Sequence, residues 1–118
     1  MKDISVIKNS ATLVILEDIK KEITAALVAE LKEIILYGSY ARNRNDKDSD
    51  MDIIVFIDGE AIDMAEIREK LSDIKVDLSL KFDIVISIIV KNYKQYKKHR
   101  EIVPFYSNIS SEGVEIYG

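Results

Sequence analysis

The stretch IILYGSYARNRNDKDSDMDIIVFI, residues 34–57, decides the fold and holds most of the residues that can carry chemistry. Two strand-like apolar runs flank a Gly-Ser turn, a polar loop and two acids, Asp50 and Asp52. Because side chains alternate between the faces of a strand, both carboxylates project from the same side. Carboxylates about 5 Å apart repel by roughly 3 kcal/mol at an effective dielectric near 20. No Lys or Arg alternates with them, so the pair predicts a bound divalent cation.

The composition is that of an ordinary globular protein, and we expect residues 1–118 to form a single domain. The net charge of −4 argues against a protein that binds long nucleic acid through its overall charge. Since cysteine is absent, disulfides, zinc–thiolate sites and thiol catalysis are excluded. The first ten residues lack the apolar core of a secretion signal, and no apolar run approaches the ~20 residues that cross a bilayer. We therefore expect a cytoplasmic protein with no membrane partner.

The spacing of apolar residues orders the rest of the chain. Ser10 is the expected N-cap of a first helix, and Asp63, three residues before Glu66, resembles a capping box at the start of a second. The expected order is a helix over 10–30, a strand over 33–37, a short helix from 39, a strand over 50–57, a helix over 64–80, a strand over 82–90, a helix after 92, a helix over 104–113 and an edge strand over 114–117. This order predicts an α+β fold, with a mixed sheet and helices packed on one side.

The turn between the first two strands has the features of an anion site. Gly38 lets the backbone approach a bound group closely, and Ser39 offers both a hydroxyl and an N–H. The sequence SYAR can begin a helix whose free N–H groups face back toward the strand end and favour negative charge. Arg42 follows Ser39 by three residues, so it shares that helical face and can reach a bound anion.

The pattern Gly38-Ser39, ten intervening residues and Asp50-x-Asp52 before an apolar strand resembles the signature of the polymerase-β nucleotidyltransferase superfamily. The strings GSYAR and SDMDIIV are similar to its minimal nucleotidyltransferase branch. The resemblance implies a polymerase-β-like fold, in which an acceptor hydroxyl attacks the α-phosphate of a nucleoside triphosphate and pyrophosphate leaves. It also implies that Gly38 and Ser39 hold the triphosphate, while Asp50, Asp52 and a third acid from the next strand hold two Mg²⁺ ions.

The third acid has two candidates. We choose Asp83, because it opens the run FDIVISIIV that we expect to form the third strand. It would also be the general base that accepts the proton of the acceptor. Asp77 is the competitor, because the surrounding VDLSL can also be read as a strand. Leu78 and Phe82 continue the helical spacing through that segment, which favours Asp83.

Other residues carry weaker signals. Tyr40 is a candidate for stacking on a base, and Asn43 stands where the family often has glycine, a backbone position that Asn tolerates. The tract KNYKQYKKHR, residues 91–100, has the basic and aromatic composition of an RNA or acidic-partner contact. A solvated helix with its tyrosines packed on the core is the simpler interpretation, and His99 is expected at the surface.

The leading functional hypothesis is a Mg²⁺-dependent transferase that moves AMP from ATP to a protein hydroxyl. The chain holds the catalytic unit and has little room for a domain that would bind tRNA or a drug. By resemblance, the acceptor would be a HEPN-type toxin and the chain its antitoxin. One alternative is a small-molecule transferase of the aminoglycoside type, which predicts an acceptor pocket formed by a homodimer. The other is a binding module that neutralises its partner by occlusion alone.

Overall fold

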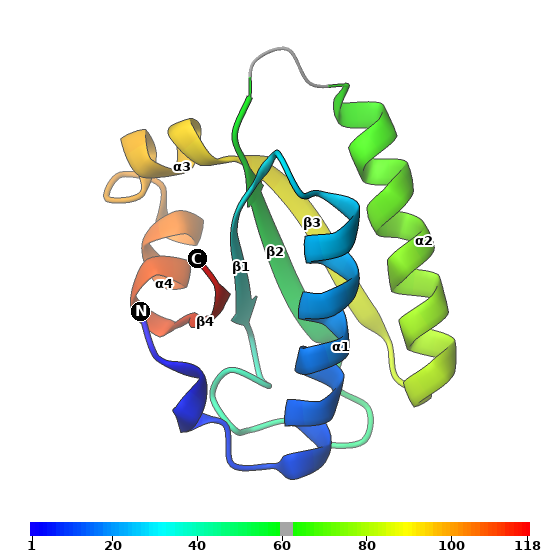
Figure 1. Ribbon diagram of the computed structural model, residues 1–118. Helices are drawn as coiled ribbons and strands as arrows, with labels where there is room; N and C mark the ends of the chain where they lie inside the picture. The colour runs from blue at the N-terminus through cyan, green and yellow to red at the C-terminus, as the bar shows by residue number, and fades with distance from the viewer. Residues whose placement is uncertain (60–62) are drawn as a thin grey trace.

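The computed structural model describes residues 1–59 and 63–118, and Figure 1 shows how its helices and strands are arranged. In chain order the elements are η1 (Ile4–Val6, a 3₁₀ turn), α1 (Ser10–Ala26), β1 (Leu31–Tyr37), β2 (Met51–Ile57), α2 (Met64–Phe82), β3 (Ile86–Asn92), α3 (Tyr93–His99), α4 (Pro104–Glu112) and β4 (Val114–Tyr117).

The four strands form one mixed sheet in the order β3-β2-β1-β4. β1 is antiparallel to both β2 and β4, whereas β2 and β3 are parallel. A parallel pair needs a long crossover, and α2 supplies it. The expected α+β class with a mixed central sheet is therefore confirmed.

The sheet is covered on both faces. Alternate residues of β1 and β2, such as Ile34 and Ile53, belong to a core shared with α1 and α2. The residues between them, such as Ile35 and Ile54, pack against Tyr96 of α3 and Ile109 of α4. The two long helices lie on one side, as expected, but the C-terminal helices cover the other side. The near-continuous apolar sequence of β2 is the signal for a strand buried on both faces.

The first helix starts and ends earlier than its periodicity predicts. Its N-cap is Asn9, whose Oδ1 accepts a hydrogen bond from the Thr12 N–H at 3.0 Å, so Ser10 is the first helical residue. The helix ends at Ala26, and β1 begins at Leu31. In the part of the chain that the structure describes, no helix is long and apolar enough to span a bilayer.

The second helix runs further than expected, and this moves the third strand. α2 continues through Phe82, and Asp83 caps it in the left-handed conformation, with φ of 53°. β3 then begins only at Ile86 and ends at Asn92, so the prediction that Asp83 opens this strand is wrong. The apolar spacing that favoured Asp83 over Asp77 continues to Phe82, so the helix continues to that residue as well. Asp83 can cap the helix because Asp is one of the few non-glycine residues that adopt the left-handed region.

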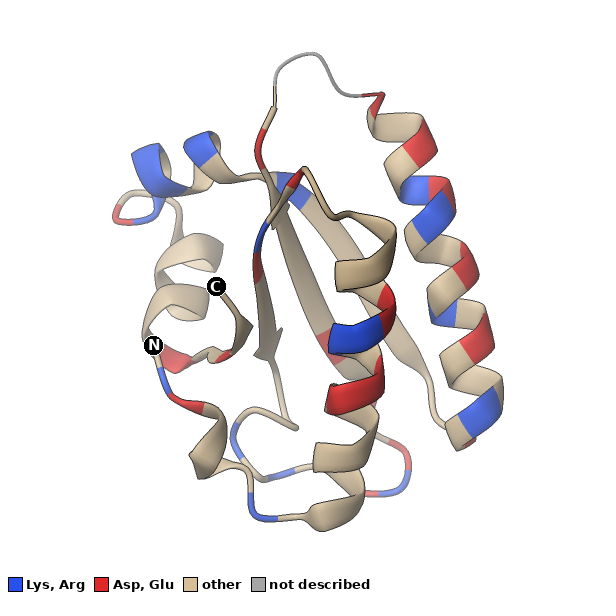
Figure 2. Cartoon of the chain, in the orientation of Figure 1, with Lys and Arg blue, Asp and Glu red and all other residues tan. Residues whose placement is uncertain are grey.

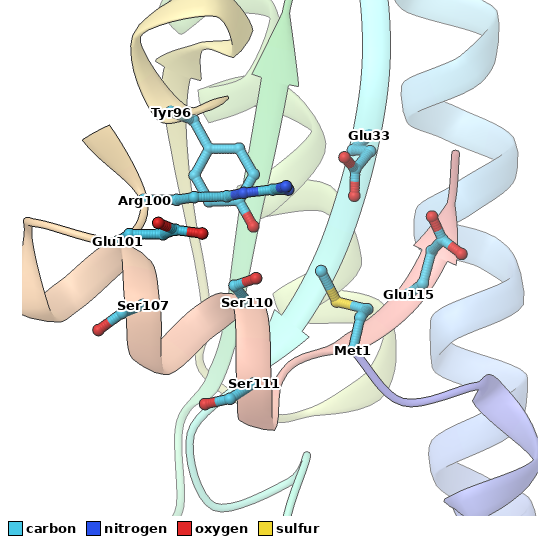
Figure 3. A pocket seen from close by; sticks show the side chains of 9 residues that line it. All are labelled: Met1, Glu33, Tyr96, Arg100, Glu101, Ser107, Ser110, Ser111 and Glu115. Carbon is cyan, nitrogen blue, oxygen red and sulfur yellow. The ribbon is translucent and has the colours of Figure 1, made fainter. Parts of the chain in front are cut away.

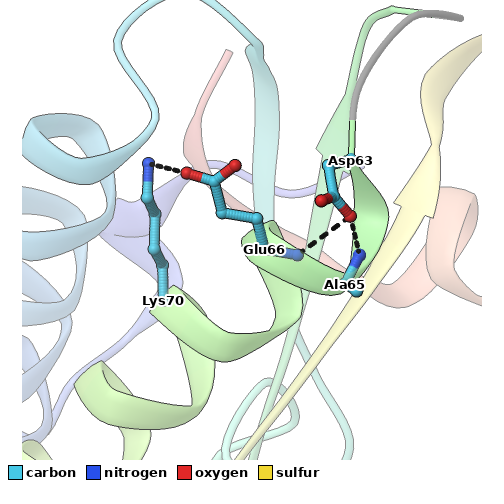
Figure 4. A network of polar contacts seen from close by, with 4 residues as sticks. All are labelled: Asp63, Ala65, Glu66 and Lys70. Atoms are coloured by element: carbon cyan, nitrogen blue, oxygen red, sulfur yellow. Dashed lines mark hydrogen bonds and ion pairs between the residues drawn. The ribbon is translucent and has the colours of Figure 1, made fainter.

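The start of α2 agrees with its expected cap. Asp63 Oδ1 accepts hydrogen bonds from the backbone N–H groups of Ala65 and Glu66, at 3.0 and 3.3 Å (Figure 4). The Glu66 carboxylate does not complete a capping box; it forms an ion pair with Lys70 at 3.6 Å. The Asp63 side chain is therefore the group that satisfies the first orphan donors of this helix.

Replacing Asp63 with alanine is expected to lower the free energy of unfolding by about 1 kcal/mol, because the two N–H groups lose their acceptor. Urea denaturation followed by circular dichroism measures the change. Asp63→Asn is the matched control, since asparagine also caps helices and should restore most of the loss. Equal losses in both variants would contradict a capping role.

Candidate functional site

The two predicted acids lie at the start of β2, and Asp52 shares the face of Ile54 and Phe56, which α3 and α4 cover. Asp52 pairs with Tyr37 of β1 on one side and with Ser87 of β3 on the other. Asp50 precedes the strand and is exposed, whereas Asp52 is half-buried. Burial raises the pKa of the Asp52 carboxyl, and the nearby charge of Asp50 raises it further. The structure thus brings this pair together as the sequence predicted.

The Gly-Ser turn lies directly against this carboxylate. Gly38 has φ of +77°, and a Cβ atom added to it would stand 2.5 Å from Oδ2 of Asp52. Only glycine fits a left-handed position with a carboxylate at that distance. The end of β1 and the start of β2 therefore form one small site, in which backbone and carboxylate face each other.

The expected short helix after Ser39 is instead a series of tight turns. Backbone N–H groups of residues 41, 42 and 43 donate to carbonyls three residues earlier, at 3.1 to 3.3 Å. Asn43 ends the series with φ of 54°, and its side-chain amide donates to the Val6 carbonyl at 2.9 Å. Tyr40 is only 6% exposed and belongs to the core, so it is not available to stack on a base.

Arg42 lies beside the turn, where an anion contact was expected. Its guanidinium forms an exposed ion pair with Glu112 of α4, at 3.8 Å. Together with Tyr37, Gly38 and Phe105, Arg42 lines a hollow of about 200 Å³ between β1 and α4. The Tyr37 and Phe105 rings meet edge to face there, with centroids 5.7 Å apart. The structure therefore places a cationic side chain and an open space next to Gly38.

The structure does not assemble the predicted set of three carboxylates. Asp83 lies at the end of α2 and lines a separate hollow with Lys47 and Asp48, while Asp77 is exposed on α2. Across residues 1–59 and 63–118, no three acidic, His or Cys side chains gather closely enough to hold a metal ion. The β3 residue in register with Asp52 is Ser87. The sequence did not point to Ser87, because the register of β3 against β2 depends on the residue at which α2 ends.

The Asp50–Asp52 pair alone has the ligands for a magnesium ion that is shared with a nucleotide. Among the described residues, no ion pair involves either carboxylate. Mg²⁺ is commonly held by one or two carboxylates together with substrate phosphates, rather than by a complete protein cage. A half-buried carboxylate with a raised pKa, a second carboxylate and no cationic partner fit such an ion.

A second hollow, of about 670 Å³, lies on the same face of the sheet near the chain ends (Figure 3). It is lined by Met1, Glu33, Tyr96, Arg100, Glu101, Ser107, Ser110, Ser111 and Glu115. Burial raises the pKa of Glu33, and the charge of Glu115 adds to that shift. None of the residues predicted for the site lines this hollow, so its size alone does not mark the site.

The basic tract follows the simpler interpretation. Tyr96 is 1% exposed and stacks on Phe56, with ring centroids 4.1 Å apart. Tyr93 packs against the same cluster, and the Nζ of Lys97 lies 5.4 Å from the centroid of the Tyr93 ring. The tyrosines of this tract therefore anchor α3 to the sheet.

A strand-terminal Gly-Ser turn held against paired carboxylates, on a mixed sheet, is the architecture that the sequence led us to expect for nucleotide chemistry. The family model described as "Nucleotidyltransferase domain" matches residues 16–107. The chain belongs to this nucleotidyltransferase family.

Two relatives from Methanocaldococcus jannaschii carry the name "putative protein adenylyltransferase". One is 36% identical over 104 residues, which cover 86% of this chain and 95% of that protein. Another is 33% identical over 87 residues, covering 74% of this chain and 79% of the relative. Among solved structures, a toxin–antitoxin crystal structure with AMP-PNP has a similar fold, with a TM-score of 0.58 at 17% identity. The match covers 87% of this chain and 73% of that chain.

Proposed function

We propose that this protein transfers AMP from ATP to a hydroxyl of a partner protein, with Mg²⁺ held by Asp50 and Asp52. The observation that carries the proposal is the contact geometry of Gly38, whose backbone lies against the Asp52 carboxylate. The names of the relatives support ATP as the nucleotide and a protein as the acceptor. The toxin–antitoxin neighbour and the family resemblance support a HEPN-type toxin as that acceptor.

In this proposal the residues of the site mainly bind and orient the charged phosphates of the nucleotide. The turn at Gly38 and Ser39, together with Arg42, binds the β- and γ-phosphates, and Arg42 leaves Glu112 when the nucleotide arrives. Mg²⁺ bound at Asp50 and Asp52 would supply neutralisation of the charge that develops on the phosphates. The acceptor oxygen bonds to the α-phosphorus as the bond to the bridging oxygen breaks, pyrophosphate leaves and the hydroxyl proton passes to solvent. The two-ion arrangement implied by the resemblance needs further oxygen ligands from nucleotide and acceptor.

A second candidate function is neutralisation by occlusion alone. The observation in its favour is that Ser87, not an acid, stands beside Asp52 on β3, so the site has two carboxylates where the resemblance implies three. Such a protein would bind its partner without modifying it.

Co-expression with a HEPN-type toxin, the proposed partner, distinguishes the two. If transfer is the mechanism, the Asp50→Ala/Asp52→Ala double variant will still form the complex but will no longer rescue growth. Rescue by the double variant would support occlusion. Asp73→Ala/Asp77→Ala is the matched control, because it removes two exposed acids from α2 and leaves the site intact.

A further inference from the structure

The outer edge of the sheet beside Asp50 is open at Ile88. β3 is an edge strand that pairs only with β2 in the described chain. The Ile86 N–H already donates to Ser79 Oγ at 3.2 Å, so this part of the edge is covered by α2. Because backbone groups alternate along a strand, those of Ile88 also point away from β2, and within residues 1–59 and 63–118 no strand pairs with them. Val90, two residues further, is only 5% exposed, so the uncovered part of the edge is at Ile88. An uncovered edge of this kind is a template for an added strand.

Exposed aliphatic side chains continue from this edge to the acids. Leu80 of α2 is 78% exposed, Val85 is 60% exposed and Val76 is 49% exposed. They line a hollow of about 480 Å³ together with Asp50 and Ser87. A second hollow of about 390 Å³ lies further along α2 and β3, where Ile88 lines it, and Lys75 lines both. We call these two adjoining hollows the α2–β3 trough.

The exposed apolar side chains of the trough differ from the charged surface of the rest of α2. Acidic and basic residues alternate over the outward surface of this helix (Figure 2). Val76 and Leu80 interrupt that pattern only in its C-terminal half, one turn apart, next to the end of the helix that approaches Asp50. A large apolar side chain that is nearly four-fifths exposed beside a candidate active site indicates an interaction surface.

The order of the strands indicates whether the nucleotide or the acceptor approaches from the α2–β3 trough. The Gly-Ser turn lies on the β1 side of the acids, whereas the trough lies on the β3 side. In an in-line displacement the attacking and leaving oxygens stand on opposite sides of the phosphorus. If the pyrophosphate leaves toward Gly38, the acceptor hydroxyl must arrive from β3.

We propose that the α2–β3 trough binds an extended segment of the acceptor protein, with aliphatic side chains on both sides of the hydroxyl residue. The segment adds to the β3 edge at Ile88, and its aliphatic side chains cover Leu80 and Val85. Its hydroxyl then reaches the α-phosphate beside Asp50. The placement of the hydroxyl rests on the function proposed above, whereas binding of the segment can be measured without any transfer.

Fluorescent ten-residue peptides test this directly by anisotropy, with and without Mg²⁺ and a non-hydrolysable ATP analogue. Peptides that carry a central tyrosine or serine between Val and Ile residues should bind, and versions flanked by Gly and Ser should not. Leu80→Glu should weaken binding roughly tenfold, as expected for an interface anchor. Val28→Glu is the matched control, because Val28 is 82% exposed outside the trough. Methylating alternate peptide amides should abolish binding in one register and leave it unchanged in the other, the mark of strand pairing.

Absence of peptide binding, or binding that Leu80→Glu leaves unchanged, would overturn the trough as an acceptor site. A dimer in light scattering that Leu80→Glu dissociates would also overturn it, since the edge would then be occupied by a second copy. If peptides bind as expected but the ATP analogue binds nowhere, the trough stands as a peptide site and the proposed transferase function fails.

Discussion

The Asp52→Asn variant is expected to lose nucleotide transfer by a factor on the order of 10³, because Mg²⁺ loses a ligand whose charge it needs. The protein should nevertheless fold, since asparagine has nearly the same shape and Asp52 makes no ion pair among the described residues. Label transfer from α-labelled ATP measures the activity. The matched control is Asp58→Asn, which removes an acid at the opposite end of β2 and should leave transfer unchanged.

The same variant should make the metal-free protein more stable at neutral pH. Burial and the Asp50 charge raise the pKa of Asp52, so the folded state binds its proton more tightly than the unfolded chain does. The stabilisation that the protonated Asp52 carboxyl gives the folded state is present below the pKa of an unfolded Asp, near 3.9. It is lost as pH rises through the higher folded pKa. Thermal melts from pH 3 to 8 should therefore show a gain for Asp52→Asn at pH 7 that shrinks toward pH 3. Mg²⁺ should raise the melting temperature of the native protein but not of the variant.

Gly38→Ala is the second substitution with a large expected effect. A methyl group there would meet Oδ2 of Asp52 at 2.5 Å, and alanine would have to adopt φ of +77°. Together these should lower the free energy of unfolding by about 1–3 kcal/mol and displace the Asp52 carboxylate. Chemical denaturation and Mn²⁺ binding should both report the change.

Gly59→Ala distinguishes backbone strain from the contact with Asp52 as the cause of the Gly38→Ala effect. Gly59 also has positive φ, 133°, but it is exposed and lies just after the other end of β2. It should therefore show backbone strain without any effect on Mn²⁺ affinity. Equal effects of both substitutions on Mn²⁺ binding would contradict the contact between Gly38 and Asp52.

Local sequence patterns were enough to predict the parts of the site that lie on neighbouring residues. The turn at Gly38 and the alternation of Asp50 and Asp52 depend only on backbone geometry within a few residues, and the structure brings them together. The order of the strands was not predicted, because it also depends on the pairing of β4 with β1, between residues about eighty positions apart.

The β3 residue that lies beside Asp52 could not be predicted, because it depends on how far α2 extends. A helix end at residue 80 would have put Asp83 on β3, whereas the observed end at Phe82 leaves Asp83 as its cap. Two residues then lie between Asp83 and the first residue of β3, and Ser87 takes the place beside Asp52. Tyr40 was misjudged for a similar reason, since the turns after Ser39 direct it into the core.

Transfer of AMP to a partner protein should depend on Asp50 and Asp52. The direct measurement is intact-mass spectrometry of a HEPN-type toxin, the proposed partner, after incubation with this protein, Mg²⁺ and each nucleoside triphosphate in turn. The toxin should gain the mass of one or more AMP groups with ATP, and should gain nothing when Asp50→Asn/Asp52→Asn replaces the native chain. A toxin that binds the native chain, stays unmodified with every triphosphate and is still neutralised would contradict the claim.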